Sequence, residues 1–109
     1  MQPPDIQVRY FPVAKISQVP EGQAVHLNVN GQAVLLCQVD GQFYAVSAIC
    51  PHAGQKLYGG RLHGWEVVCP LHRARFDVRN GACTAAPAAE SLHSFPVLLE
   101  AGKVSIGMS

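Results

Sequence analysis

Two short segments each combine a cysteine with a histidine, and these four residues constrain the fold more than any other feature of the chain. The segments are Cys50-x-His52 and Cys69-x-x-His72, and a proline directly follows each cysteine. Thiolates and imidazoles are side chains that bind transition metals and iron-sulfur clusters. A metal site built from both segments requires two loops that meet, so the rest of the chain has to hold those loops together.

The mixed pairing distinguishes between metals. Structural zinc sites usually present like pairs, with two cysteines on one segment and two histidines on the other. A [2Fe-2S] cluster in which two imidazoles replace two thiolates on one iron suits one cysteine and one histidine from each loop. We therefore predict that Cys50 and Cys69 bind one iron and that His52 and His72 bind the other, which accepts the electron. A zinc site remains the alternative.

The stretch from Ile49 to Pro87 resembles the Rieske-type [2Fe-2S] ferredoxins of aromatic ring-hydroxylating dioxygenase systems, through CPHAG, CPLH followed by RARFDVRNG, and TAAPA. The resemblance implies an all-β, small antiparallel Rieske fold, with β-sandwich-like sheets and a cluster-binding subdomain at one tip, covered by a loop at Pro87. It also implies a soluble one-electron carrier that passes electrons from a flavoprotein reductase to a terminal Rieske oxygenase. One departure is Arg73, because the family commonly has glycine after the second histidine.

Two positions after the second histidine bear on the reduction potential. In the high-potential relatives that the chain resembles, a serine hydroxyl donates to a bridging sulfide and a tyrosine hydroxyl donates to a cysteine sulfur. The matching residues here are Ala74 and Phe76, which have no hydroxyl. Because hydrogen bonds to sulfur favour the reduced cluster, we expect a potential near the low end of the Rieske range, about −150 mV.

The length of the chain fits a single domain, which we place at residues 1–109. A Rieske oxygenase that performs catalysis itself also needs a mononuclear iron domain with two histidines and a carboxylate. Outside the predicted ligands only His26, His63 and His93 remain, and they are widely separated. We therefore expect an electron-transfer component of an oxygenase system and not an enzyme.

No run approaches the roughly 20 apolar residues that span a bilayer, and the first residues show no charged segment followed by an apolar one. We expect a cytoplasmic monomer with no membrane contact and transient docking of its partners. The net charge is only +1, which argues against nucleic acid. We interpret the basic residues near the predicted loops as a rim that steers an acidic partner, with ordinary solvated charges as the alternative. These residues are Lys56, Arg61, Arg73, Arg75 and Arg79.

Turn signals divide most of the chain into short β-prone segments. Hairpin signals lie at Asn30-Gly31, Asp40-Gly41, His63-Gly64 and Asn80-Gly81. The predicted strands are 24–29, 32–39, 42–48, 60–62, 66–68, 75–78, 92–100 and 103–106. We expect 82–89 to form a loop because proline interrupts it. Cys37 lies in a short apolar run, which predicts a reduced thiol in a buried strand.

Two other functional classes remain open. One is the small Rieske subunit of a multisubunit reductase such as NADH-dependent nitrite reductase, which a large exposed apolar patch would favour. The other is a binding module held together by a metal with no redox role. The identity of the redox partners and the ultimate substrate do not follow from the sequence.

Overall fold

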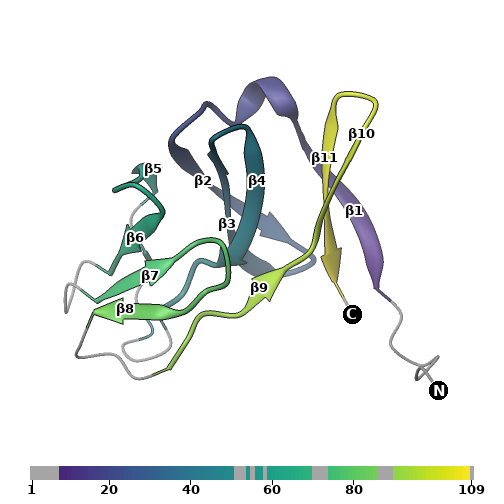
Figure 1. Cartoon of the computed structure of the whole chain (residues 1–109). Helices are drawn as coiled ribbons and strands as arrows, with labels where there is room; N and C mark the ends of the chain where they lie inside the picture. The colour runs from purple at the N-terminus through teal and green to yellow at the C-terminus, as the bar shows by residue number, and fades with distance from the viewer. Residues whose placement is uncertain are drawn as a thin grey trace, which may run out of the picture.

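The structure is a computed structural model that describes residues 8–50, 54, 56–57, 59–69, 74–85 and 90–108. These residues form three antiparallel sheets and one short 3₁₀ helix, η1 (Ile16–Gln18), with no α-helix among them. The sheet at one end has the order β1-β11-β10, the central sheet β5-β2-β3-β4-β9, and the sheet at the other end β6-β7-β8 (Figure 1). The predicted all-β antiparallel fold is therefore confirmed.

The strands are short, and most begin or end within two residues of the predicted limits. Their bounds are β1 (Arg9–Lys15), β2 (Gln23–Val29), β3 (Gln32–Val39), β4 (Gln42–Ser47), β5 (Gly60–Arg61), β6 (Glu66–Val68), β7 (Arg75–Asp77), β8 (Cys83–Ala85), β9 (Ser94–Phe95), β10 (Val97–Glu100) and β11 (Lys103–Met108).

Two predicted turns have the backbone conformation that a tight hairpin requires. Asn30 and Gly31 both have positive φ (56° and 85°), and so do Asp40 and Gly41 (54° and 75°). Positive φ at both central residues matches the twist of the flanking strands, which explains the preference for Asn-Gly and Asp-Gly there. The resulting hairpins, β2-β3 and β3-β4, form the central sheet.

Strand β3 is buried on both faces and separates two hydrophobic cores. Leu35 and Cys37 face the core shared with β6, β7 and the two predicted ligand cysteines, which we name the site core. Val34 and Leu36 face the second core, shared with β11. Because side chains alternate along a strand, a continuous apolar run is what burial on both faces requires.

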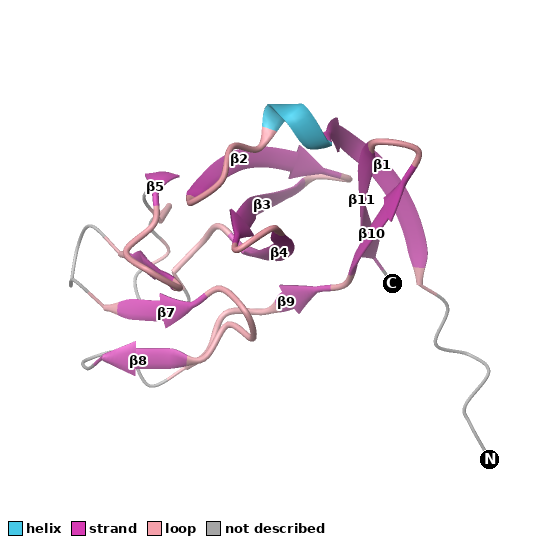
Figure 2. Cartoon of the chain, turned by 45° about the horizontal axis from the view of Figure 1, so that its top comes forward, coloured by secondary structure: helices cyan, strands magenta, loops and turns pink. Residues whose placement is uncertain are grey.

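The prediction of one strand over 92–100 is wrong. The segment divides at Pro96 into β9, which pairs with β4, and β10, which pairs with β11 in a different sheet. Proline has no N–H to donate to a ladder, and the Pro96 carbonyl instead accepts from the N–H of Gly107 at 2.9 Å. The chain thus passes from the central sheet to the β1-β11-β10 sheet at this proline (Figure 2).

Two further strands were not predicted. Strand β1 contains Pro12 and a register shift between Pro12 and Ala14, so it lacks a regular alternating pattern. Strand β8 lies within the segment that we expected to be a loop, and that expectation is wrong for Cys83–Ala85. The rest of the predicted loop, including Pro87, lies outside the described residues.

Candidate metal centre

The first predicted ligand loop leaves the end of β4 and is closed at its base by backbone hydrogen bonds. Leu57 donates its N–H to the carbonyl of Ala48 at 2.8 Å, and Gly54 donates to the carbonyl of Cys50 at 2.8 Å. Gly54 has φ 67°, a conformation that favours glycine. Cys50 is fully buried at the start of this loop. His52 lies outside the described residues.

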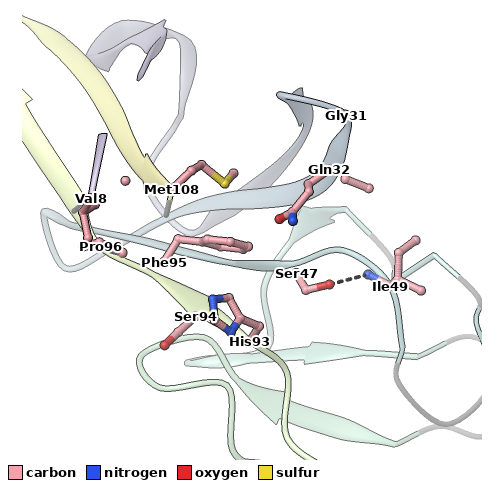
Figure 3. Close-up of a pocket in the computed structure, with 12 residues that line it drawn as sticks. Val8, Gly31, Gln32, Ser47, Ile49, His93, Ser94, Phe95, Pro96 and Met108 are labelled. Atoms are coloured by element: carbon pink, nitrogen blue, oxygen red, sulfur yellow. Dashed lines mark hydrogen bonds between the residues drawn. The ribbon is translucent and has the colours of Figure 1, made fainter. Parts of the chain in front are cut away.

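The approach to this loop is fixed by the side chain of Ser47. Its hydroxyl oxygen accepts the N–H of Ile49 at 3.3 Å, as Figure 3 shows. The Ser47 N–H donates to the carbonyl of His93 at 2.8 Å, which ties β4 to the segment before β9. The backbone immediately before Cys50 is therefore held from two directions.

The second predicted ligand loop joins β6 to β7. Strand pairing brings Val68 opposite Arg75, and the next hydrogen bond runs from the N–H of Cys69 to the carbonyl of Ala74 at 2.8 Å. Cys69 and Ala74 are both fully buried. His72 and Arg73, between them in sequence, lie outside the described residues.

The two cysteines, distant in sequence, belong to the same buried core. The site core surrounds Cys50 and Cys69 with aliphatic and aromatic side chains, including Leu57, Val67 and Phe76. Two buried sulfurs at the bases of two closed loops are a donor set that suits an iron-sulfur cluster in a water-poor environment. Among the described residues no group of three or more His, Cys, Asp or Glu could hold a metal. The predicted imidazoles are not among those residues.

The remaining cysteines differ from each other in burial. Cys37 is fully buried in the site core, and this burial raises the pKa of its thiol from 9.0 to about 12. The prediction of a buried core thiol on β3 is therefore confirmed. Cys83 is half-buried on β8 and packs against the site core.

The described residues of the predicted basic rim are all exposed, and two of them also lie near a carboxylate. Lys56, Arg61 and Arg75 are exposed, and Arg75 lies 3.9 Å from the Glu66 carboxylate. The Arg79 guanidinium, also exposed, donates to Asp77 with nitrogen-oxygen distances of 3.0 and 2.7 Å. This pairing lowers the pKa of Asp77 through the hydrogen bond from Arg79. Sequence proximity alone did not distinguish Arg79 from the others.

A separate cavity of about 790 Å³ lies between β9 and the ends of β1, β3 and β11. Its lining includes Gln32, His93, Phe95 and Met108, and Figure 3 shows these side chains around it. The His93 ring lies 4.6 Å from the Phe95 ring in an edge-to-face arrangement. Among the described residues that line this cavity there is no charged side chain and neither cysteine of the candidate centre. His93 lines this cavity and not the site core.

The three antiparallel sheets and the two closed loops, each burying a cysteine, define a class of small β proteins suited to hold an iron-sulfur centre. Residues 9–96 match the family model described as the Rieske [2Fe-2S] domain. The chain belongs to this family. It binds one [2Fe-2S] cluster and serves as an electron carrier, as its relatives show.

The relatives are similar over most of their length. The chain is 33% identical over 101 residues to the ferredoxin component of the naphthalene 1,2-dioxygenase system of Pseudomonas aeruginosa, covering 93% of this chain and 97% of the relative. It is 37% identical over 90 residues to the ferredoxin component of the p-cumate 2,3-dioxygenase system of Pseudomonas putida, covering 81% and 76%. Both relatives are named as the ferredoxin component of a dioxygenase system.

Solved structures agree with the fold. The ferredoxin of carbazole 1,9a-dioxygenase from Nocardioides aromaticivorans IC177 superimposes with a TM-score of 0.83 at 32% identity, covering 89% of this chain and 95% of that one. A similar chain, at 28% identity and a TM-score of 0.82, comes from a complex of reduced oxygenase and oxidized ferredoxin in carbazole 1,9a-dioxygenase, with coverage of 89% and 91%. In the part of the chain that the structure describes, no helix has the length and apolar character needed to cross a membrane.

Proposed function

We propose that Cys50 and Cys69 bind one iron of the cluster and that His52 and His72 bind the other. The support is the burial of both cysteines in one core, each at the base of a loop whose sequence carries a histidine two or three residues later. Buried thiolates suit a cluster that is kept away from water. When bound, the cluster stores a single electron.

The protein around the predicted ligands excludes water and fixes the loops. Ala74, Phe76 and Leu57 are buried beside the cysteines and offer no side-chain hydrogen-bond donor. The backbone bonds between residues 48 and 57 and between 69 and 74 hold the two loop bases. A rigid site of this kind changes its structure little when an electron arrives, which suits a carrier.

In this proposal the carrier is a cytoplasmic, single-domain monomer that accepts electrons from a flavoprotein reductase and delivers them to a terminal Rieske oxygenase. The observation that supports this direction of transfer is the similarity, over nearly the whole chain, to ferredoxin components of dioxygenase systems. A similar ferredoxin also occurs in complex with an oxygenase. Docking is transient, because a carrier has to leave one partner to meet the next.

The ligand set is tested on the purified full chain. We expect two iron and two acid-labile sulfide per chain and a rhombic electron paramagnetic resonance (EPR) signal only after reduction. Serine at Cys50 or Cys69, or alanine at His52 or His72, should abolish the cluster, while Cys37→Ala should retain it as a matched cysteine control. Stoichiometric zinc without sulfide would contradict the proposal.

Partner docking is tested by charge reversal. Arg75 is 58% exposed beside the second loop, whereas Arg9 is exposed on β1 in the sheet at the other end of the molecule. Arg75→Glu should slow electron delivery to a terminal oxygenase at low salt, and the difference should shrink once the screening length falls to about 10 Å near 0.1 M salt. Arg9→Glu should have little effect. Equal rates for both variants would leave Arg75 outside the docking surface.

A further inference from the structure

Trp65 is held between side chains from two other parts of the chain. The Arg79 guanidinium carbon lies 4.3 Å from the centre of the indole ring, in the position of a cation-π contact. The Tyr44 ring lies 6.0 Å from the indole ring centre at an interplanar angle of 81°. Asp77 accepts two hydrogen bonds from the same guanidinium, at 3.0 and 2.7 Å.

Trp65 lies in the tight turn that leads into β6, the strand that ends directly before Cys69. Hydrogen bonds between the backbones of His63 and Glu66 close this turn, and β6 runs from Glu66 to Val68. Val67 and Cys69 are buried in the site core, and Trp65 packs against that core from its edge. The backbone agrees, because the Trp65 carbonyl accepts the N–H of Val78 at 2.8 Å and so extends the β6-β7 pairing.

The same contacts join two sheets. Tyr44 belongs to β4 of the central sheet, whereas Trp65 precedes β6 and Arg79 follows β7. The loop with Cys50 leaves the end of β4, and the loop with Cys69 joins β6 to β7. The Tyr44-Trp65-Arg79 contacts, which we name the aromatic clamp, therefore connect the two elements that deliver the two cysteines.

We infer that Trp65 is a positioning residue of the redox site, which keeps β6, and Cys69 directly after it, against the central sheet and keeps water out of the site core. The inference rests on the proposed ligand set. Trp65 touches no reacting atom; it acts through the packing of Val67 and Cys69. Arg79, which looked like part of a docking rim in the sequence, serves in this view to hold the indole ring.

The aromatic clamp should lower the reduction potential, because it keeps water away from the site. Two ferric ions, two sulfides and two thiolates sum to zero charge, and adding one electron makes the reduced site negative. Water stabilises the charged form more than the neutral form, so admitting water favours reduction. Loss of the indole should therefore raise the midpoint potential, even where iron and sulfide content stay complete.

The experiment uses the full-length holoprotein and three variants. Trp65→Ala removes the ring, Trp65→Phe keeps an aromatic ring in place, and Arg79→Lys keeps the positive charge while losing the planar stacking and the paired bonds to Asp77. Tyr10→Ala is the matched control, because it removes an exposed aromatic ring on β1, in the other three-stranded sheet. The readouts are the midpoint potential, the EPR spectrum of the reduced protein, and iron and sulfide content.

We expect Trp65→Ala to raise the ratio of reduced to oxidised protein about tenfold at a fixed ambient potential, which is 59 mV for one electron. Arg79→Lys should raise it two- to threefold, and Trp65→Phe and Tyr10→Ala should leave it within twofold. Because Trp65 is the only tryptophan, increased acrylamide quenching of its fluorescence in Arg79→Lys reports the opening of the clamp directly.

Unchanged potentials and EPR spectra in Trp65→Ala and Arg79→Lys, with full iron and sulfide, would overturn the inference. If Trp65→Ala fails to retain the cluster, Arg79→Lys decides: a raised potential supports the clamp and a wild-type potential refutes it. A wild-type protein without iron and sulfide would instead refute the proposed ligand set, so the two failures are distinguishable.

Discussion

Ala74→Ser and Phe76→Tyr should each raise the reduction potential of the protein. Both wild-type side chains are fully buried in the site core together with Cys50 and Cys69, and neither can donate a hydrogen bond. The Ala74 carbonyl already accepts the N–H of Cys69, so residue 74 lies at the base of the second loop. A hydroxyl added at either position could donate a hydrogen bond to a cysteine sulfur or a sulfide of the proposed site.

The magnitude depends on which redox state the hydroxyl stabilises. A hydrogen bond to sulfur that strengthens on reduction is worth about 1 to 2 kcal/mol, or about 45 to 85 mV for one electron. A buried hydroxyl that finds no acceptor costs about 1 to 3 kcal/mol of stability in both redox states, and leaves the potential unchanged. Stability and potential therefore separate the two outcomes.

Dye-mediated redox titration with optical detection measures the potentials, and guanidinium unfolding measures the stabilities. We expect the wild type near −150 mV, each variant higher by the amount above, and the double variant higher still. Ala45→Ser is the control, because Ala45 is buried in the second core. The added serine hydroxyl should lower the stability there without changing the reduction potential. A wild-type potential near the positive end of the Rieske range would refute the reasoning.

Three further predictions use pairs of matched positions. Because burial raises the pKa of Cys37 to about 12, the folded protein keeps a thiol proton that the unfolded chain loses above pH 9. The free energy of unfolding of the wild type, relative to that of Cys37→Ala, should therefore fall between pH 9 and 12 by up to about 1.4 kcal/mol per pH unit. An equal pH dependence of unfolding in both proteins would contradict this. Gly81→Ala should lower the free energy of unfolding by at least about 2 kcal/mol more than Gly41→Ala. Both glycines have positive φ, but only a Cβ at Gly81 would overlap neighbouring backbone, and equal losses of stability would count against that overlap. Leu35→Ala and Leu36→Ala should each lose about 2 to 5 kcal/mol of stability, but only Leu35→Ala, which faces the site core, should also shift the midpoint potential.

The sequence predicts the hairpins of the central sheet because their causes are local. Asn30-Gly31 and Asp40-Gly41 need only their own backbone preferences to form the turns. The end of β9 is less visible, because Leu92 to Glu100 reads as one apolar segment and only Pro96 marks the change of sheet. Strand β8 is too short to carry a pattern of its own and forms because β7 offers a partner.

The candidate metal centre is predictable for the same reason, and its surroundings are not. Each predicted ligand pair lies within four residues of sequence, so spacing alone indicates the chemistry. The aromatic clamp instead joins Tyr44, Trp65 and Arg79 across two sheets, and no spacing rule connects them. Arg79 also pairs with Asp77, only two residues away, but the sequence does not show that its guanidinium lies over the indole ring as well.

The arrangement of the cores explains why the site tolerates such distant contributions. Because β3 is buried on both faces, the second core supports the central sheet from the face opposite Cys50 and Cys69. The packing of the site core can therefore affect the reduction potential separately. The hydrogen bonds from Ser47 and Leu57 hold the first loop to that sheet, while Cys69 and Ala74 hold the second. The site core joins the bases of the two loops, and the contact of Trp65 with Tyr44 of β4 adds a further connection at its edge.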